Sequence, residues 1–440
     1  MTTFVRSIGR WTMAGLVINA TIGSSIFALP GELSRLLGRA SPLAIVVAGI
    51  ALMIIMAAII EVASQFADAG GAYAYVRVAF GRFWGLQVGW FWLLSFLGGC
   101  AAAATIFVGY AGSFFPGVDS GWRRVVVISI VLAVPVIANC LGVRQAANLC
   151  NFFTAAKVLP LVLIGILGLI KFHGQLGLIH PREIVAPGWN AWLTALLLLL
   201  AAMGGAEDTL APAGEVKDPR RTIPFGVAMG FLVSALLYLS VQFVTVATLG
   251  SASLDRPLVG AAIVLIGHAG TQLISLSVMV STYGMIAAGI MNAPRLTYAL
   301  SAHGDFPHSL SQLHPRFRTP ALAICLFAVP LWILAVSGSF RWLIAVTGGS
   351  MAIEYIGMCA ALIRLRKLRP DAALRIPWGR ACAWFGFAVC IVLLTQLRVS
   401  EFSLMAIVGL AAAGNAWWSL RRDKLSSTEA QKRLAEPVSS

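Results

Sequence analysis

Apolar residues run along this chain in long stretches that are separated by short polar segments. Twelve of the stretches are close to, or above, the roughly 20 residues that an α-helix needs to cross a bilayer. They lie at 12–37, 42–66, 84–114, 123–141, 149–171, 191–213, 223–249, 269–300, 320–337, 342–364, 381–398 and 402–420. The pattern predicts an all-α integral membrane protein with twelve transmembrane helices.

Small and polar residues interrupt two of these stretches near their middle. The first has Gly-Ser-Ser at 23–25, and the sixth has Gly-Gly-Ala at 204–206 followed by Glu207 and Asp208. A lone Gly/Ser triplet is more typical of close helix packing, but an acid at mid-membrane depth costs about 2.5–3.5 kcal/mol and needs a function. Two broken helices at corresponding places in two halves of a chain indicate the substrate site of a secondary transporter.

Composition and charge support a membrane location. The chain has 440 residues and is 59% hydrophobic and 11% charged, whereas soluble domains carry about 25% charged residues. Its net charge of +15 could attract nucleic acid, but most Lys and Arg residues fall on alternate connections between the stretches. This positive-inside bias predicts a multi-pass protein of the cell (inner, cytoplasmic) membrane with both termini in the cytoplasm and no nucleic-acid partner.

The residues that carry chemistry in other protein classes form no pattern here. The seven cysteines lie in or beside apolar stretches, without CxxC or Cys/His pairing, so we expect small core side chains and neither a metal nor a cofactor. A membrane enzyme would need a convergent catalytic set, and a channel would need a continuous polar lining. The sequence shows neither, so a carrier is the favoured class.

Lys157, Glu61 and Asp208 also need an interpretation, because each is a charged residue inside an apolar stretch. Lys157 either snorkels to the inner face or points inward for function. Glu61 is interpreted as a buried hydrogen-bonding hub that fixes helix packing rather than as a ligand. Asp208 lies about 100° from Glu207 around a helix, so we expect at most one of these two acids to face the site.

Four segments of the chain resemble the amino acid–polyamine–organocation (APC) superfamily. They are NATIGSSIFALP at 19–30, DAGGAYAYVRVAFG at 68–81, GGAEDTLAPAGEVKDPRRTIP at 204–224, and APRLTYALSAHGDFP with HPRFRTP between 293 and 320. Each motif alone is weak, but the four occur in the order that the family has. The resemblance implies a LeuT-like fold, a five-plus-five inverted repeat with discontinuous helices 1 and 6, that works by alternating access.

The repeat divides the chain into six parts. They are a cytoplasmic N-terminus (1–11), a first five-helix repeat (12–172), an external loop (173–190), a second five-helix repeat (191–364), two peripheral helices (381–420) and a cytoplasmic tail (421–440). We expect segments 68–81 and 295–320 to be loops at the inner face. The polar tail is expected to be disordered.

The resemblance also implies where a substrate binds. Its α-carboxylate would meet the backbone amides of residues 23–25, and its α-amino group would meet carbonyls around Ile22 and Ala206, in keeping with the donors and acceptors that broken helix ends expose. The substrate-binding set is Ile22, Gly23, Ser24, Ser25, Ile26, Gly204, Gly205, Ala206 and Glu207. The coupling set is Lys157 and Glu207, because Lys157 falls where sodium-driven relatives of the family hold a cation.

The chain departs from the family pattern at three positions. Ser25 stands where glycine is commoner, which stiffens the first break. Ala206 stands where a bulky aromatic gate is frequent, which predicts a wider pocket. Asp208 is unusual next to Glu207, which matches a position that is acidic in several relatives and tied there to proton sensing or to the substrate amine.

The favoured function is an amino acid permease that moves its substrate by proton symport or by exchange, without sodium. The small residues of the pocket favour a neutral amino acid slightly, whereas the two acids suit a cationic amino acid or polyamine, so an antiporter of that class is the main alternative. A channel and a non-transporting sensor on the same fold stay open. The expected partners are an amino acid, protons and the lipid bilayer, and the sequence sets no oligomeric state.

Overall fold

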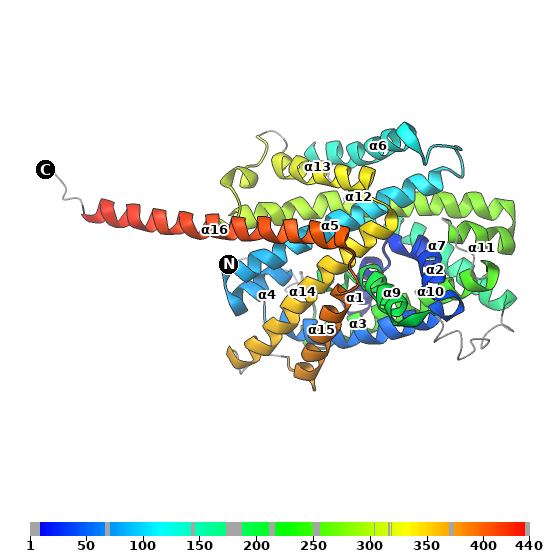
Figure 1. The fold of residues 1–440 in the computed structure, drawn as a ribbon, viewed down its shortest axis with the longest axis horizontal. Coiled ribbons are helices and arrows are strands. Elements are labelled where there is room, and N and C mark those ends of the chain that lie inside the picture. The colour runs from blue at the N-terminus through cyan, green and yellow to red at the C-terminus, as the bar shows by residue number, and fades with distance from the viewer. Residues whose placement is uncertain are drawn as a thin grey trace.

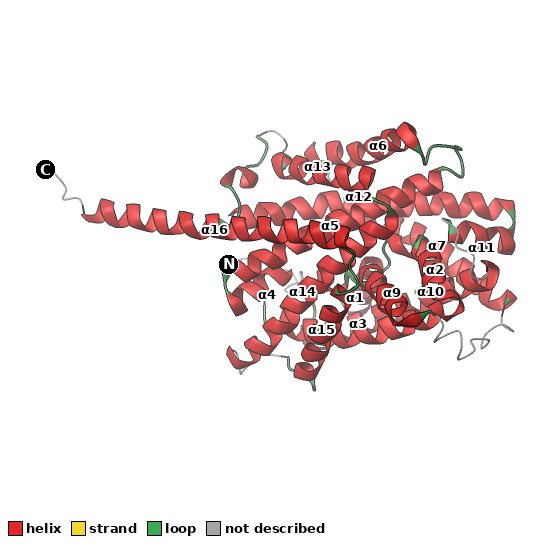
Figure 2. Cartoon of the chain, viewed as in Figure 1, coloured by secondary structure: helices red, strands yellow, loops and turns green. Residues whose placement is uncertain are grey.

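The computed structural model of this chain describes residues 9–66, 71–141, 146–172, 187–210, 216–249, 256–302, 304–315, 317, 319–368 and 374–435. Throughout this part the protein is helical and contains no β-strand (Figure 2). The α-helices are α1 (Arg10–Thr21), α2 (Leu29–Leu37), α3 (Ser41–Ala63), α4 (Gly71–Phe80), α5 (Arg82–Ala111), α6 (Gly121–Cys140), α7 (Ala146–Lys171), α9 (Gly188–Met203), α10 (Pro219–Leu249), α11 (Pro257–Ile266), α12 (His268–Ala302), α13 (Ala321–Ser337), α14 (Phe340–Leu368), α15 (Gly379–Leu394) and α16 (Val399–Ala435). The short 3₁₀ segments are η1 (Ser24–Phe27), η2 (Gly38–Ala40), η4 (Ala206–Leu210) and η6 (His308–Ser311).

The helices are those of a membrane protein. Eight segments of the described residues are long and apolar enough to cross a bilayer, and three shorter apolar helices, α11, α13 and α15, accompany them. Exposed positions on the long helices carry large apolar side chains, which suit lipid rather than water; examples are Ile50, Ile130, Leu236, Leu276 and Leu410. The expected all-helical, multi-pass architecture is therefore confirmed, and the count of twelve spans stays a prediction.

Each predicted apolar stretch coincides with helix, but three predictions about the connections are wrong. Segment 68–81 contains α4, which buries one face including Tyr73 and Val76. α12 continues to Ala302, because its last turns still bury Leu300 against a small apolar cluster. α16 is helical to Ala435, since no Gly or Pro follows Gly414 until residue 437. Residues 1–8 of the N-terminus, 173–186 of the external loop and 436–440 of the tail lie outside the described residues.

Two helices end in the middle of their apolar stretches. α1 has 12 residues and α9 has 16, and each is shorter than the about 20 residues of a membrane span. After α1 the backbone is extended at Gly23 before it winds into η1 and α2. After α9 it is extended at Gly204 and has a φ of +101° at Gly205 before η4 begins. Both interruptions predicted from the sequence are present.

The broken helices lie inside the bundle, where neighbouring helices hold them. α1 packs against α10, η1 against α5 and α12, and η4 against α1 and α3. α5 also contacts α14 and α12, and α16 lies along it and then projects beyond the bundle (Figure 1). The two breaks are therefore enclosed by α3, α5, α10 and α12.

Glu61 is a structural hub, as predicted. Its buried carboxylate accepts hydrogen bonds from Nε and Nη2 of Arg366 at 2.6 and 2.7 Å, and from the backbone N–H of Ile376 at 3.0 Å. A bidentate arginine–carboxylate pair fixes geometry as well as adding energy. Since these bonds join α3 to α14 and to the segment before α15, Glu61 holds three parts of the bundle in place.

Candidate functional site

The two breaks face each other. A Cβ atom placed on Gly205 would lie 3.1 Å from the carbonyl oxygen of Ala20, so the second break touches the end of α1. The hydroxyl of Tyr238, on α10, donates to the carbonyl of Ala202 at 2.6 Å and lies 3.4 Å from the carbonyl oxygen of Thr21. Tyr238 therefore links the last turn of α9 to the last turn of α1, and the structure brings together the two segments that the sequence singled out.

Lys157 reaches the first break from α7. Its Nζ donates to the carbonyl oxygens of Asn19 at 2.6 Å and Ile22 at 2.7 Å, and the residue is only 9% exposed. These carbonyls belong to the C-terminal end of α1, where a helix leaves its last carbonyls without intrahelical partners and where the helix dipole favours a cation. Lys157 thus points inward and does not snorkel to the inner face.

Glycine is required at the second break and not at the first. Gly205 has a positive φ that side-chain-bearing residues rarely adopt. A Cβ on Gly204 would lie 2.8 Å from the carbonyl oxygen of Leu200 and 3.0 Å from the hydroxyl of Tyr355. Gly23 is extended, and the nearest atom to a Cβ there is the Sδ of Met285 at 3.8 Å, an ordinary contact.

Two of the three backbone donors expected to hold a carboxylate, those of Gly23 and Ser24, have partners in this structure. The N–H of Gly23 donates to the carbonyl of Thr21 at 3.0 Å, and the N–H of Ser24 donates to the Sδ of Met285, on α12, at 3.3 Å. A thioether sulfur is a weak acceptor, so a carboxylate would be a better partner for Ser24 than Met285 is. Ser25 and Ile26 are buried in η1 immediately beyond these donors.

The carbonyls expected to hold an amino group also accept hydrogen bonds from within the protein. The carbonyl oxygen of Ile22 accepts from Lys157, and that of Ala206 accepts from the hydroxyl of Thr209 at 2.6 Å. A carbonyl oxygen has two lone pairs, so each can accept one further hydrogen bond. The Ile22 carbonyl, which already faces an ammonium, has the geometry of a cation-binding helix end.

Acidic side chains gather at the second break. Oε2 of Glu207 accepts from the N–H of Gly205 at 3.0 Å, and Oδ1 of Asp208 accepts from the indole Nε1–H of Trp92, on α5, at 3.1 Å. The side chain of Asp208 is exposed, whereas that of Glu207 is half-buried. The two acids therefore have different hydrogen-bond partners: Glu207 bonds to the break itself and Asp208 bonds to α5.

Sequence reasoning missed a third acid, Glu354 on α14. The residue is 1% exposed, lies beside Ser95 of α5, and is within electrostatic range of Glu207 and Asp208. Its Oε1 has no hydrogen-bond partner in the described part of the chain. The signal was available, because Glu354 is an acid inside the apolar stretch 342–364, which is the property that singled out Glu207.

A cavity of about 220 Å³ lies beside the first break. Its lining residues are Ala28, Glu32, Arg35, Thr105, Ile106, Gly109, Tyr110 and Phe340. Ala28 directly follows η1, and the hydroxyl of Tyr110 donates to the carbonyl of Phe27 at 2.8 Å. Glu32 and Arg35, both on α2, form an ion pair at 2.8 Å on the wall of this cavity.

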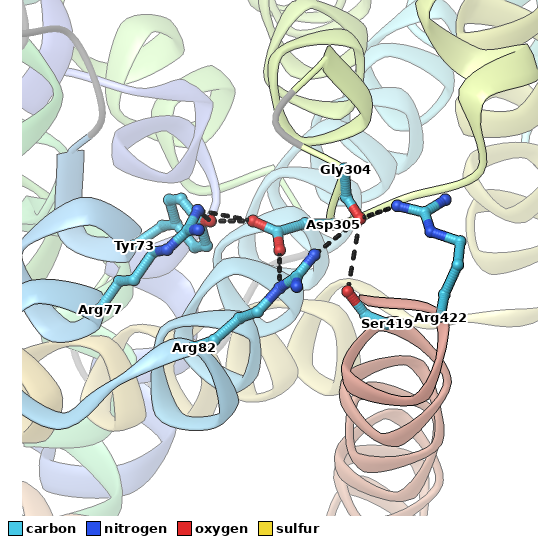
Figure 3. Close-up of polar contacts among 7 residues, drawn as sticks. All are labelled: Tyr73, Arg77, Arg82, Gly304, Asp305, Ser419 and Arg422. Carbon is cyan, nitrogen blue, oxygen red and sulfur yellow. Dashed lines mark hydrogen bonds and ion pairs between the residues drawn. The ribbon is translucent and has the colours of Figure 1, made fainter. Parts of the chain in front are cut away.

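A second polar cluster, separate from the breaks, surrounds Asp305 after the end of α12 (Figure 3). The buried carboxylate of Asp305 accepts from the Tyr73 hydroxyl, from Arg77 Nη1 at 2.9 Å and from Arg82 Nε. Burial, and then the neighbouring Asp305, raise the pKa of Tyr73 well above its ordinary value, so the phenol keeps the proton that it donates. Asp305 therefore ties α4 and the start of α5 to the segment after α12.

The same cluster includes the C-terminal helix. The carbonyl oxygen of Gly304 accepts from Arg82 Nη2 at 2.7 Å, Ser419 Oγ at 3.3 Å and Arg422 Nη2 at 2.5 Å. Figure 3 shows Ser419 and Arg422 on one helix approaching Gly304 opposite Arg82. We call these residues the inner clasp: Tyr73, Arg77, Arg82, Gly304, Asp305, Ser419 and Arg422.

Three known proteins that resemble the chain are named as an exchanger, a transporter and a permease of amino acids. A serine/threonine exchanger of Bacillus subtilis is 28% identical over 72% of this chain and 74% of its own length. A vacuolar cationic amino acid transporter of Arabidopsis thaliana is 25% identical over 80% of this chain and 62% of its own length. A branched-chain amino acid permease of Bacillus subtilis is 22% identical over 92% of this chain and 91% of its own length.

A family profile described as amino acid permease matches residues 8–418. That range contains both breaks, Lys157, the three acids and most of the inner clasp. The relatives are exchangers, transporters and permeases, which are transport proteins rather than enzymes. The chain belongs to the amino acid permease family of the APC superfamily.

Proposed function

We propose that this protein is a secondary active transporter that carries amino acids across the cell membrane by alternating access, without sodium. The observation that carries the proposal is the meeting of two helix breaks, which Tyr238 links through the carbonyls of Ala202 and Thr21. Broken helices that expose backbone groups at mid-depth are the recurrent substrate site of secondary transporters. The names of the relatives, which include exchangers and permeases of amino acids, support this substrate class.

The proposed architecture is a LeuT-like five-plus-five inverted repeat with twelve spans. Residues 12–172 and 191–364 form the two repeats, and the two helices within 381–420 are peripheral. The corresponding positions of the breaks, after α1 in one half and after α9 in the other, support this division. Both termini lie in the cytoplasm, because the connections rich in Lys and Arg then face inward.

The substrate backbone binds across the two breaks. Its carboxylate accepts hydrogen bonds from the backbone N–H of Ser24 and from neighbouring N–H groups in η1. It thereby replaces the Sδ of Met285 as the acceptor for Ser24. Its amino group donates a hydrogen bond to the carbonyl oxygen of Ile22 or Ala206, each of which has a second lone pair to accept it. The proximity of Gly205 to Ala20 places these donors and acceptors in one small space.

Coupling is assigned to Lys157 and Glu207. Lys157 supplies a fixed positive charge at the end of α1, which is the task that a bound cation performs elsewhere in the family. Glu207 accepts from the second break, and Asp208, Glu354 and Tyr355 are the titratable groups that face it. A proton taken up by Glu207 would weaken the bond from the N–H of Gly205, because a neutral carboxyl is a poorer acceptor than a carboxylate, so protonation can change the break.

Uptake into liposomes that contain the purified protein tests the proposal. We expect saturable uptake of a radiolabelled amino acid, driven either by an inward proton gradient or by the same amino acid trapped inside, and equal in sodium and potassium buffers. The two driving forces distinguish symport from exchange. Absence of uptake and of exchange for all twenty amino acids would refute the carrier function, and uptake that does not saturate would indicate a channel.

Glu207→Ala and Glu207→Gln test the coupling residue in the same liposomes. Both variants should lose uptake or its pH dependence while keeping the chromatographic profile of the folded protein, because neither side chain can exchange a proton at the break. Asp218→Asn is the matched control, since Asp218 is a largely exposed acid in the connection before α10. Uptake by the Glu207 variants with the pH dependence of the wild type would exclude Glu207 from coupling.

A further inference from the structure

A second cavity, of about 100 Å³, lies where the ends of four helices meet. Its walls come from the N-terminal parts of α9, α14 and α16 and from the segment after α15. The described lining includes none of the residues assigned to the substrate or to coupling. The ends of membrane-spanning helices lie near the lipid headgroups. The polar residues of the lining are Thr194, Arg341, Gln396, Arg398 and Glu401.

The two arginines of this lining lack a close acidic partner. Within the described part of the chain, the guanidinium of Arg398 forms neither a hydrogen bond nor an ion pair. Nη1 of Arg341 lies 4.0 Å from Oε2 of Glu32, on α2, which is too far for a hydrogen bond. Two cationic side chains that line one cavity repel each other and attract an anion.

Glu401 is the acid in this lining, and it serves the backbone. The residue is 4% exposed, and its Oε2 accepts from the backbone N–H of Arg398, which directly precedes α16. A glutamate at the third position of a helix that bonds back to this N–H caps the start of the helix. No ion pair joins Glu401 to Arg341 or Arg398 in the described chain. Two arginines and one glutamate leave a net charge of +1 on the cavity wall.

Gln396 adds a neutral donor to the same wall. A glutamine amide has two N–H donors, and one of these goes to the Oγ1 of Thr395 at 3.0 Å. The other has no protein acceptor among the described residues. Guanidinium groups bind phosphate through two parallel N–H donors, so two arginines and an amide N–H together suit an anion with several oxygens.

The surroundings of the cavity suit a lipid. Val399 and Phe402 directly follow Arg398 and Glu401 in sequence, and they are 83% and 63% exposed. Val392, in the last turn of α15, is exposed as well. Large exposed apolar side chains on membrane helices face lipid, so acyl chains along α16 would bring a headgroup to the cavity.

We propose that this cavity, which we call the arginine pocket, binds a phosphate group that is carried by a phospholipid headgroup or is free in solution. Arg341 and Arg398 pair with phosphate oxygens, and the unused N–H of Gln396 donates to a further oxygen. The bound group ties α14 to the start of α16, so it stabilises the folded protein. This inference goes beyond the proposed function, because the arginine pocket contains no residue of the substrate site.

Thermal unfolding of the purified full-length protein in detergent tests the arginine pocket. The probes are phosphatidylglycerol, diacylglycerol with the same acyl chains and no phosphate, and inorganic phosphate against chloride at equal ionic strength. A probe that binds the folded protein raises its unfolding temperature by mass action. We expect a saturable rise with phosphatidylglycerol and none with diacylglycerol.

The probes also distinguish the two sources of the phosphate group. A rise with phosphatidylglycerol alone assigns the arginine pocket to a lipid headgroup. A rise with inorganic phosphate, with or without one from the lipid, shows that free phosphate is sufficient. No rise with either probe, or an equal rise with diacylglycerol and phosphatidylglycerol, would overturn the proposal.

Arginine variants locate the binding. Arg398→Gln should weaken the apparent affinity for the stabilising probe about tenfold or more, because it removes a charged donor, and Arg398→Lys should retain part of that affinity. Arg123→Gln is the matched control, since Arg123 is an exposed arginine beside Trp122 in α6. Arg341→Gln repeats the test from α14 should Arg398→Gln not fold. An affinity that is unchanged in both pocket variants, or that falls equally in Arg123→Gln, would overturn the arginine pocket.

Discussion

Gly23 and Gly205 stand at equivalent places in the two breaks, yet they are glycines for different reasons. Gly205 has a φ of +101° and touches the carbonyl of Ala20, so both backbone conformation and space exclude a side chain. Gly23 is extended, and a Cβ there would meet nothing nearer than 3.8 Å. The backbone conformation of the second break therefore requires its glycine, and that of the first break does not.

Replacement of each glycine by alanine measures this difference. Gly205→Ala should lower the stability of the folded protein by about 1–2 kcal/mol through backbone strain, and more if Ala20 cannot move, and the distorted break should lower uptake well below that of Gly23→Ala. Gly23→Ala should keep uptake within a few-fold of the wild type. Initial rates of uptake per folded protein give the comparison. Equal losses in the two variants would contradict the geometry described for the breaks.

Lys157 and Lys171 are a matched pair of lysines that donate to backbone carbonyls. Lys157→Met should leave the carbonyls of Asn19, which is half-buried, and Ile22, which is buried, without this donor, at up to about 1–3 kcal/mol each, and should lower both thermal stability and uptake. Lys171→Met removes a bond to the carbonyl of Val264 at an exposed position, where water replaces the donor. Thermal unfolding in detergent, with uptake in liposomes, should separate the two. A Lys157→Met protein as stable and active as Lys171→Met would refute the assigned role.

Among the elements, α10 links the two broken helices. Its residue Tyr238 is buried and donates to the end of α9 while lying against the end of α1. α1 also packs along α10. Any movement of one broken helix relative to the other must therefore alter the contacts of Tyr238. Through this residue, α10 holds the ends of α1 and α9 side by side.

Tyr238→Phe should show this link. The variant leaves the Ala202 carbonyl without its donor, which costs about 1–3 kcal/mol, and it frees the two helix ends from each other. We expect weaker substrate binding, measured as a rise in the KM for uptake, together with a lower unfolding temperature. Tyr75→Phe, which removes the hydroxyl of another buried tyrosine, on α4, is the control. An unchanged KM in Tyr238→Phe would show that the hydroxyl does not hold the breaks in register.

The sequence predicted elements better than the contacts between them. Apolar stretches of span length locate the helices, and glycines beside acids locate the breaks, because both signals are local. Tyr238 and Met285 gave no such signal, since a Tyr or Met in an apolar helix indicates burial without saying what it meets. The predictions for the connections were wrong for a related reason. α4 is helical because its buried face packs on the bundle, and the local sequence of 68–81 does not indicate this packing.

At the scale of the molecule, the inner clasp joins segments that are far apart in the chain. Asp305 and Gly304 hold α4, α5 and α16 around the end of α12 (Figure 3). The broken helices contribute no residue to it. In a carrier where the broken helices move against the rest of the bundle, the clasp therefore belongs to the part that stays fixed.

Asp305→Asn tests whether the clasp is a fixed support. Removal of the charge leaves Arg77 and Arg82 without their buried partner, and breaking a buried pair costs about 3–5 kcal/mol. Asp119→Asn is the control, because Asp119 pairs with Arg256 at 2.8 Å in a more exposed setting, where pairs contribute at most about 1 kcal/mol. Thermal unfolding in detergent should show a larger fall for Asp305→Asn.

The same variant also distinguishes a support from a gate. A fixed support changes stability without changing what the substrate meets, so the folded fraction of Asp305→Asn should keep the KM of the wild type. A gate would change the balance between outward-facing and inward-facing states, and KM would change with it. A large change in KM with little loss of stability would place the clasp among the moving parts, and the division into fixed and moving helices would then have to be redrawn around α12.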